Sequence, residues 1–346
     1  MNPSLELFER ERAAGRPLVA AIVIATTGST YRKPGAWMLF TQSGERAGLL
    51  SGGCLEGDLG ERAARLLAEG RRLELTSYDS RSSDDPIWGL GLGCEGLMQI
   101  LLLRVDATGG YQPLAELARL EAAGEAGSWS VALAVAGAGA GAAPGQVWLD
   151  AHGQPAGLST TTLGGASVEL FVAQVARAPR VLICGAGPDV EPVVAWGAAL
   201  SWHLSVVDHR SAYIDPARFP AARAVRRLDA DELACALDLS RFDAAVVMSH
   251  HLIADGRYLA ALAPAPIPYV GLLGPAARRE RLFAEIGAAA TATLRPRLRA
   301  PVGLDLGGRT PEAIALSIVA EVQAALHGRQ GEPFSMHLGQ PNPEDG

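Results

Sequence analysis

The C-terminal half of the chain alternates short apolar runs with helical segments, which are expected at about 190–199, from 233, from about 275 and at about 310–326. The apolar runs lie at residues 180–184, 204–207, 244–248 and 267–273. Short runs that are apolar at almost every position are typical of strands buried on both faces. Because strands that alternate with helices form parallel sheets, this half is predicted to be a Rossmann-like domain with helices on both faces of its sheet.

The N-terminal half has a different pattern, which predicts a mixed α+β domain. Strands are expected at residues 18–25, in a hairpin of 37–41 and 46–50, and at 73–78, 97–105, 131–135, 146–149 and 168–175. The Gly/Ala-rich and Thr-rich stretches between the last three strands are expected to be loops. The fold class is therefore α/β, with domains at 1–177 and 178–329 and a disordered tail at 330–346.

Composition and charge exclude several classes of protein. The 346 residues carry 30 Lys and Arg against 37 Asp and Glu, a net charge of −7, which argues against a nucleic-acid binder. The four cysteines form no CxxC pair, so neither a zinc pattern nor a disulfide framework is expected. The charged N-terminus is unlike a secretory signal, and the longest uncharged stretch, 126–149, holds too many glycines for a membrane-spanning helix. A cytoplasmic protein is expected.

The turn after the first C-terminal strand is similar to a dinucleotide-binding fingerprint. Gly185 and Gly187 supply the first two glycines, but Val190 stands at the third position, where close packing of helix on strand usually requires glycine. Asp208 follows at the end of the next strand, where a carboxylate can accept a hydrogen bond from a ribose hydroxyl. Two interpretations stay open, a nucleotide or cofactor-phosphate site and a Rossmann topology that binds no dinucleotide.

Further candidate residues follow the other strands of the predicted sheet. His250 and Asp255 come after the third apolar run, and ligands of open parallel sheets bind outside the carboxyl ends of strands. Gly271 and Gly274 lie at the end of the fourth run, and Arg278 lies in the first turns of the following helix. A helix N-terminus beside an arginine favours an anion. The alternative for each side chain is an ordinary loop or surface role.

Two cysteines lie in separate glycine-rich turns of the N-terminal half. Cys54 follows Gly52 and Gly53 and precedes a helical segment, a position at which backbone N–H groups favour a thiolate. Cys94 lies in the turn 89–96, whose glycines let a bulky ligand approach the backbone. The pair indicates a shared ligand or a sulfur-handling site, and the simpler alternative is that both are small residues packed in tight turns.

Eight segments carry a resemblance to a known family. They are ATTGSTYRKPGAWMLF at 25–40, SGGCLEGDL at 51–59, WGLGLGCEG at 88–96, VLICGAGPDVEPV at 181–193, SVVDHR at 205–210, VVMSHH at 246–251, YVGLLGPAARRERL at 269–282 and APVGLDLGGRTPEAIALSIVAEV at 300–322. In content and order they resemble the XdhC/CoxI family of accessory factors for xanthine dehydrogenase and carbon monoxide dehydrogenase, over nearly the whole chain.

The resemblance implies a protein that binds molybdenum cofactor (molybdopterin) and assists its sulfuration and its insertion into a xanthine or CO dehydrogenase-like molybdenum hydroxylase. It implies a maturation chaperone rather than a stand-alone enzyme. Cys54 is the first candidate for contact with molybdenum or sulfur and Cys94 the second, and Gly52, Gly53 and Glu56 are further candidates for cofactor binding. The implied partners are the apo hydroxylase, a cysteine desulfurase and a second copy of the chain in a homodimer.

Other functions stay open beside this one. The GAG at 185–187 with Asp208 is also compatible with an NAD(P)-linked oxidoreductase, or with a nucleotide-sensing module that performs no chemistry. At 187–189 this chain has Gly-Pro-Asp where the family commonly has Gly-His-Val. The sequence leaves two roles for the chain itself, transferring sulfur or holding the cofactor for a cysteine desulfurase.

Overall fold

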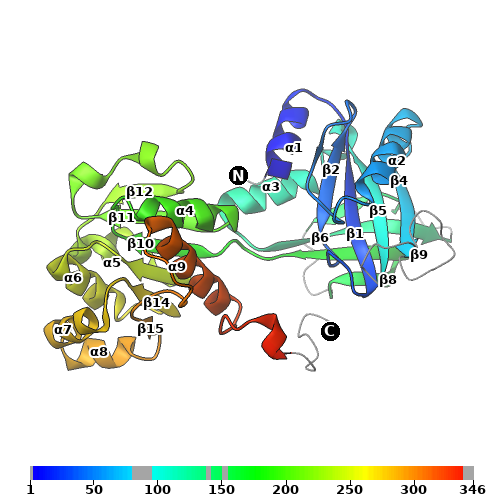
Figure 1. Ribbon diagram of the computed structural model, residues 1–346. Coiled ribbons are helices and arrows are strands. Elements are labelled where there is room, and N and C mark those ends of the chain that lie inside the picture. Colours follow the sequence, from blue (N-terminus) through cyan, green and yellow to red (C-terminus); the bar gives the residue numbers. More distant parts are fainter. Residues whose placement is uncertain (1–2, 80–95, 138–141, 150–154, 338–346) are drawn as a thin grey trace. The chain divides into compact units, whose positions relative to one another are not determined.

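The computed structural model describes residues 3–79, 96–137, 142–149 and 155–337. The chain divides into two compact units, Met1–Arg177 and Ala178–Gly346 (Figure 1). Each unit has its own sheets and its own apolar clusters, as expected of separate domains. Within the expected tail, Phe334–His337 form a 3-10 turn, and 338–346 lie outside the described residues.

The first unit contains an antiparallel sheet whose described strands have the order β3-β2-β1-β5-β4. The strands are β1 (Leu18–Gly28), β2 (Trp37–Thr41), β3 (Arg46–Ala47), β4 (Leu73–Asp79) and β5 (Gly96–Val105). Side chains of β1 alternate between two apolar clusters, because successive residues of a strand point to opposite faces. Helix α2 (Glu56–Ala68) covers one face, whereas α1 (Pro3–Ala13) and α3 (Leu114–Ala123) pack with the other.

A second antiparallel sheet of this unit has the order β7-β6-β9-β8. Its strands are β6 (Gly127–Ala136), β7 (Val147–Leu149), β8 (Gly157–Leu163) and β9 (Ala166–Val175). The prediction of a Thr-rich loop is wrong here, because residues 157–163 form the strand β8 along β9. Threonine favours strands, and Gly164 and Gly165 both have a positive φ (56° and 88°), which permits the tight turn into β9.

The second unit is built on a parallel sheet with the strand order β12-β11-β10-β13-β14-β15. The strands are β10 (Arg180–Cys184), β11 (His203–Asp208), β12 (Ala224–Arg227), β13 (Ala244–Val247), β14 (Tyr269–Leu272) and β15 (Leu298–Arg299). The predicted α/β fold class and the Rossmann-like parallel sheet are therefore confirmed. The direction of the strand order reverses at β10, and ligand crevices form at such a reversal, outside the carboxyl ends of the strands.

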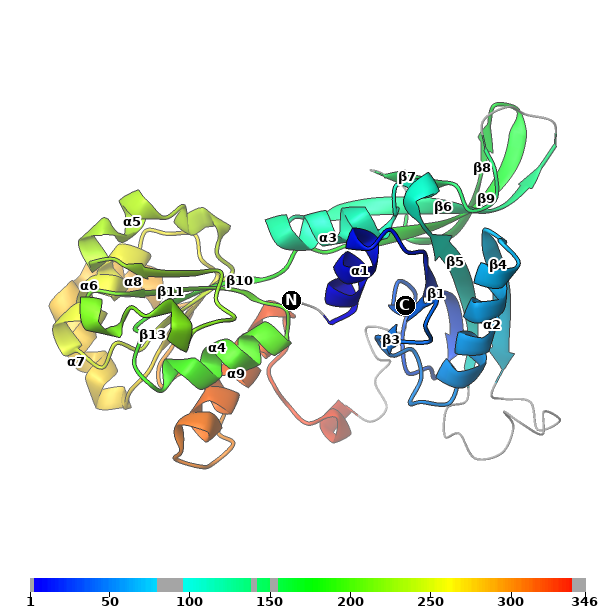
Figure 2. The same ribbon diagram turned by 90° about the horizontal axis from the view of Figure 1, so that it is seen from above.

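Helices cover both faces of this sheet, as predicted (Figure 2). One face packs against α4 (Val190–Ala199) and α9 (Pro311–Leu326), and the other packs against α5 (Leu233–Ala236), α6 (Leu252–Leu262), α7 (Ala276–Ile286) and α8 (Ala288–Leu294). The sequence pattern did not predict α6. Its start is set by His251 at the N-cap, whose Nδ1 accepts a hydrogen bond from the N–H of Ala254 (3.2 Å).

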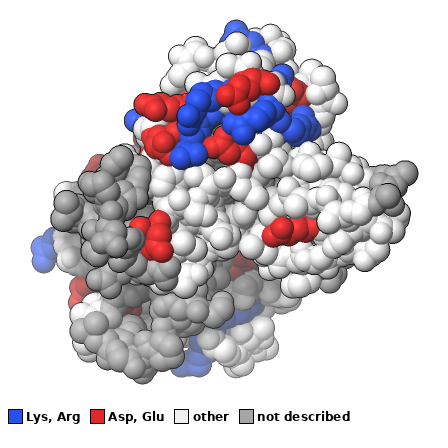
Figure 3. All heavy atoms as spheres, turned by 90° about the vertical axis from the view of Figure 1, so that its right-hand side faces the viewer, with Lys and Arg blue, Asp and Glu red and all other residues white. Residues whose placement is uncertain are grey.

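Charged side chains of the first unit lie intermingled on the face seen in Figure 3. Around α2 and β4, Arg62 pairs with Asp58 (2.7 Å) and with Glu74 (2.8 Å), and Arg71 pairs with Glu74 (2.6 Å). These paired charges present no strong field of one sign to an approaching partner. In the part of the chain that the structure describes, no helix combines the length and the apolar character needed to cross a membrane.

Candidate functional site

Cys54 lies in an exposed turn immediately before α2. Gly52, Gly53 and Cys54 are exposed, whereas Ser51 and Leu55 on either side are buried. Gly53 has a φ of +112°, in the left-handed region that favours glycine. A Cβ added to Gly52 or Gly53 would have no described atom within 4 Å, so the described residues do not crowd the backbone beside Cys54.

The buried carboxylate of Glu56 holds this turn in place. Its Oε1 accepts hydrogen bonds from the N–H groups of Leu50 (3.1 Å) and Ser51 (2.8 Å), and its Oε2 accepts one from Ser51 Oγ (2.6 Å). Ser51 Oγ in turn accepts a hydrogen bond from the N–H of Leu55 (2.9 Å). Burial by itself raises the pKa of Glu56, but these hydrogen bonds outweigh it, so the pKa lies below its ordinary value. Glu56 therefore faces the loop backbone and positions Cys54.

The other cysteines differ from Cys54 in their surroundings. Cys94 lies outside the described residues, so its predicted pairing with Cys54 stays a prediction. Cys184 is fully buried at the end of β10, and burial strongly raises the pKa of its thiol. Cys235, in the second unit, is exposed. Among the described residues of the first unit, Cys54 is therefore the thiol available to a soft metal or a sulfur donor.

The glycine turn of the second unit requires glycine at its first position. Gly185 has a φ of +135°, and a Cβ there would lie 2.5 Å from the carbonyl oxygen of Met248. Its N–H donates to the carbonyl oxygen of Val207 (2.7 Å), which ties the turn to the neighbouring strand β11. A Cβ on Gly187 would lie 2.5 Å from a carboxylate oxygen of Asp189, a side chain that can move. The turn therefore requires glycine at position 185, whereas position 187 can accept a larger residue if Asp189 moves.

Asp208 is buried beneath this turn and is fully engaged by protein groups. Its oxygens accept hydrogen bonds from the N–H of Ala186 (2.8 Å), the N–H of Arg210 (2.8 Å) and the guanidinium of Arg210 (2.8 and 3.0 Å). Burial raises the pKa of Asp208, but the bonds from Arg210 and Ala186 outweigh it and lower the pKa overall. A ribose hydroxyl would therefore have to compete with Arg210 for this carboxylate.

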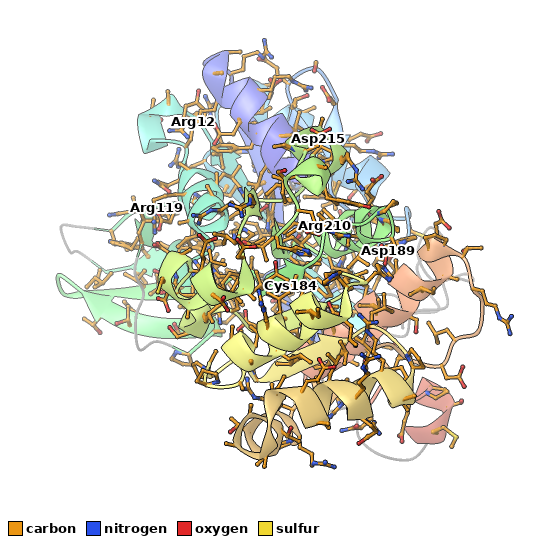
Figure 4. The ribbon with its side chains drawn as sticks, turned by 90° about the vertical axis from the view of Figure 1, so that its left-hand side faces the viewer. Arg12, Arg119, Cys184, Asp189, Arg210 and Asp215 are labelled. Carbon is orange, nitrogen blue, oxygen red and sulfur yellow. The ribbon has the colours of Figure 1, made fainter. Side chains whose placement is uncertain are left out.

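Arg210 is a residue that the sequence reasoning missed. Its Nη2 also donates to the carbonyl oxygen of Ser249 (3.1 Å), so its side chain reaches from the end of β11 to the end of β13. Because β10 lies between these two strands, the guanidinium crosses the carboxyl end of β10. Figure 4 labels Arg210, Asp189 and Cys184 in this region. A signal was present in the sequence, since Arg210 is two residues from Asp208 in the quoted segment SVVDHR.

His250 and Asp189 form a pair at the mouth of the turn. His250 Nε2 lies 2.7 Å from Asp189 Oδ2, and the imidazole is largely exposed. His250 has a φ of +58°, which few residues other than glycine adopt, so the loop after β13 holds it in a strained conformation. Asp189, next to the glycine turn, is thus joined to a predicted site residue.

Asp255 joins three elements of the second unit. Its Oδ1 accepts hydrogen bonds from the N–H (3.2 Å) and the Oγ (2.5 Å) of Ser249, and its Oδ2 accepts one from Arg278 Nη2 (2.6 Å). Asp255 is fully buried, and the Nε of Arg278 is buried with no hydrogen-bond partner in the described structure. Gly274, between β14 and α7, has a φ of +129°. Gly271 is packed inside β14, where a Cβ would lie 2.6 Å from Val302.

The candidate residues of the second unit thus gather at the carboxyl ends of its strands, with Gly271 inside the sheet. Their acids lie against neighbouring basic side chains, with Asp208 on Arg210, Asp255 on Arg278 and Asp189 within hydrogen-bond distance of His250. A cavity of about 250 Å³, lined by residues such as Leu237, Asp238 and Pro264, holds none of the candidates. The described residues contain no cluster of three or more His, Cys, Asp or Glu suited to a metal ion.

These features define a protein with an α+β unit that exposes one cysteine turn and a Rossmann unit whose crevice is lined by internal ion pairs. Residues 11–79 match the XdhC and CoxI family, and residues 181–322 match the XdhC Rossmann domain. A probable xanthine dehydrogenase subunit of Bacillus subtilis (strain 168) is 31% identical over 312 residues, which cover 88% of this chain and 92% of the relative. The chain belongs to the XdhC and CoxI family, as the sequence predicted.

Two further relatives extend this comparison. "Molybdenum cofactor insertion chaperone PaoD" of Escherichia coli (strain K12) is 26% identical over 321 residues, which cover 91% of this chain and 85% of the relative. A crystal structure of a xanthine dehydrogenase from Bacillus halodurans is 29% identical, with a TM-score of 0.75, and the match covers 97% of this chain and 99% of that one. The similarity to these proteins therefore spans both units.

Proposed function

We propose that this protein is an accessory factor for a xanthine or CO dehydrogenase-like molybdenum hydroxylase. In this role it binds molybdenum cofactor, assists its sulfuration and hands it to the apo-enzyme. The names of the relatives from Bacillus subtilis and Escherichia coli support the proposal, because one refers to xanthine dehydrogenase and the other to molybdenum cofactor insertion. The protein then acts as a maturation chaperone rather than as a stand-alone enzyme, with a homodimer as its expected assembly.

The observation that carries the proposal is the exposed thiol of Cys54 in a rigidly supported turn. A soft sulfur ligand suits molybdenum and persulfide sulfur. Glu56 and Ser51 fix the backbone on both sides, whereas Gly52 and Gly53 leave room for a large cofactor to approach. We assign Cys54 as the residue that contacts the molybdenum of the bound cargo. Cys94 is the second candidate for contact with molybdenum or sulfur.

The second unit has its own candidates for binding the phosphate of a cofactor. Gly274 and the unpartnered Nε of Arg278 lie at the start of α7, where a helix N-terminus and a guanidinium favour a phosphate. Gly185 and Gly187 present a backbone turn, and His250 is exposed beside it. Asp208 and Asp255 are buried, so we assign them the positioning of Arg210 and Arg278 rather than ligand contact.

The test is the molybdenum and pterin content of the full chain, expressed in a host that makes molybdenum cofactor. Wild type is compared with Cys54→Ser and with the matched control Cys235→Ser, which removes an exposed thiol from the other unit. We expect cofactor to co-purify with wild type and Cys235→Ser and to fall severalfold in Cys54→Ser. Wild type without pterin, or equal contents in all three proteins, would contradict the proposal.

The partners are tested with the same set of variants. Added to an apo molybdenum hydroxylase, wild type should raise its activity, and Cys54→Ser should not. If a cysteine desulfurase supplies the sulfur, the gain in activity should require that enzyme. If the chain transfers sulfur itself, the Cys54 thiolate should take the outer sulfur of an added persulfide donor, which leaves as a thiol, and mass spectrometry should find the persulfide on Cys54. Sedimentation of the purified protein checks the expected homodimer.

An NAD(P)-binding function is the second candidate, and the Rossmann sheet with its strictly built Gly185 turn is the observation in its favour. The Arg210 guanidinium on Asp208 and the absence of the third glycine stand against it. A titration with NADH and NADPH decides the matter. A flat titration would remove both the oxidoreductase and a dinucleotide-sensing role.

A further inference from the structure

A small cavity opens between the residues that follow β11 and β12 and the first turns of α6. Its volume is about 80 Å³, and its polar lining comes from His209, Asp229, His251 and Arg257. His209 follows β11 and Asp229 follows β12. His251 caps α6, and Arg257 lies on α6. None of them belongs to the site assigned above. The cavity is therefore a separate feature of the carboxyl edge of the sheet.

The two imidazoles of the cavity have nitrogen atoms left for a ligand. His251 Nδ1 accepts a hydrogen bond from the N–H of Ala254 (3.2 Å), so the proton of the neutral ring belongs on Nε2, which can donate. The His209 ring lies 5.5 Å from the His251 ring, between centroids. His209 Nδ1 is buried without a hydrogen-bond partner in the described structure, 3.3 Å from Asp208 Oδ1. Nε2 of His209 likewise forms no hydrogen bond within the described residues.

The charge of the cavity favours an anion. Arg257 is exposed and has no hydrogen bond or ion pair within the described residues. The nearby Asp208 is neutralised by the two-pronged hydrogen bonds of Arg210. Asp229 is paired with Arg227 (2.8 Å) and also accepts a backbone hydrogen bond as the cap of the following turn. The cavity is therefore lined by one guanidinium and two imidazoles that are available to a ligand, whereas the carboxylates of Asp208 and Asp229 already have hydrogen-bond donors.

The size of the cavity selects the ligand. Pockets for whole drug-sized molecules measure roughly 300–1,000 Å³, and about 80 Å³ has room for a few waters or one tetrahedral anion but not for a purine or a pterin. It lies next to Asp208, at the strand end where Rossmann proteins hold a ribose. We propose that His209, His251 and Arg257 form a subsite for a phosphate monoester. The phosphate belongs either to the ribose of a nucleotide or to the end of a pterin cofactor.

The test measures the binding of inorganic phosphate to the full chain by calorimetry at low ionic strength, where charge effects are least screened. Arg257→Gln removes the free guanidinium, and His251→Asn removes Nε2 while asparagine still caps α6. Arg309→Gln is the matched control, because Arg309 is exposed and forms no ion pair with the described residues. We expect one saturable site in wild type, about tenfold weaker in Arg257→Gln and weaker in His251→Asn, with Arg309→Gln within about twofold.

A second titration, with adenosine 2′-phosphate, distinguishes a nucleotide from another phosphorylated cofactor as the ligand. Binding much tighter than that of inorganic phosphate, and weakened by Arg257→Gln, assigns the subsite to a nucleotide. Binding no tighter than that of inorganic phosphate assigns it to the terminal phosphate of another cofactor. The subsite is wrong if wild type shows no saturable binding of phosphate, or if Arg257→Gln and Arg309→Gln bind alike. Because this readout needs no molybdenum, its failure is distinct from a failure of the cofactor-carrier proposal.

Discussion

The Cys54 turn of the first unit and the crevice of the second unit are both held by a buried carboxylate bonded to a serine, but the two carboxylates hold different groups. In each, a buried carboxylate accepts hydrogen bonds from the N–H and the Oγ of one serine, Glu56 from Ser51 and Asp255 from Ser249. The hydrogen bonds described for Glu56 come from uncharged groups, whereas Asp255 also holds the cation Arg278. The first arrangement holds an exposed thiol in place, and the second fixes an arginine.

This difference predicts that the two carboxylates have unequal importance for stability. Asp255→Ala should lower the free energy of unfolding by about 3 kcal/mol, because it leaves the Arg278 guanidinium without its buried partner. Hydrogen exchange read by mass spectrometry reports each unit separately, and faster exchange should be confined to the second unit. Asp305→Ala, at an exposed carboxylate, is the control. A loss no larger than that of the control would break the comparison.

The corresponding change in the first unit should cost less. Glu56→Ala leaves the N–H groups of Leu50 and Ser51 without their buried acceptor but strands no ion, so we expect about 2 kcal/mol. It should also loosen the turn and raise the rate at which a thiol reagent modifies Cys54. Glu56→Gln keeps one acceptor oxygen and should fall between wild type and Glu56→Ala. An unchanged labelling rate in Glu56→Ala would show that the carboxylate does not position Cys54.

Both units should lose stability in acid, with a defined sign. The pKa of Glu56 and that of Asp208 are lowered in the folded chain, since hydrogen bonds outweigh burial. Each group therefore stabilises the fold above its unfolded-state pKa, about 4, and this contribution is lost as the pH falls through the lower folded-state pKa. The stability gap between wild type and Asp208→Asn, measured by urea unfolding, should shrink from pH 7 toward pH 3. A constant gap would contradict the assignment.

The smallest effect on stability is expected at Cys54 itself. Because its side chain is exposed, Cys54→Ser should change the free energy of unfolding by less than about 0.5 kcal/mol. Cys184→Ser places a hydroxyl in the core at the end of β10 and should cost about 2 kcal/mol. Thermal unfolding of the two variants side by side checks this contrast. A large loss in Cys54→Ser would mean that the thiol is structural.

Much of the fold could be predicted from local sequence. The apolar runs of the second unit are buried on both faces of a parallel sheet, and such strands are recognised by their continuous hydrophobicity. Several elements escaped prediction, and β8 and α6 show why. The threonines of β8 form a strand because β9 supplies its pairing partner, and α6 begins where His251 accepts a backbone N–H, which a histidine seldom signals. The strand depends on its partner strand, whereas the helix start depends on a local cap of an uncommon residue type.

The candidate site divides in the same way. The sequence by itself determined the Rossmann sheet, the family, and the glycines around Cys54 and Gly185, because strand hydrophobicity and positive φ are properties of the local chain. Only the tertiary structure decided which polar groups are free. The sequence predicts Asp208 as a ligand residue, but in the structure Arg210 is hydrogen-bonded to it. The sequence gives Arg257 no role, but in the structure it lines a cavity. The reason is physical: a buried carboxylate requires hydrogen-bond partners, and their identity depends on which strand ends the sheet brings together.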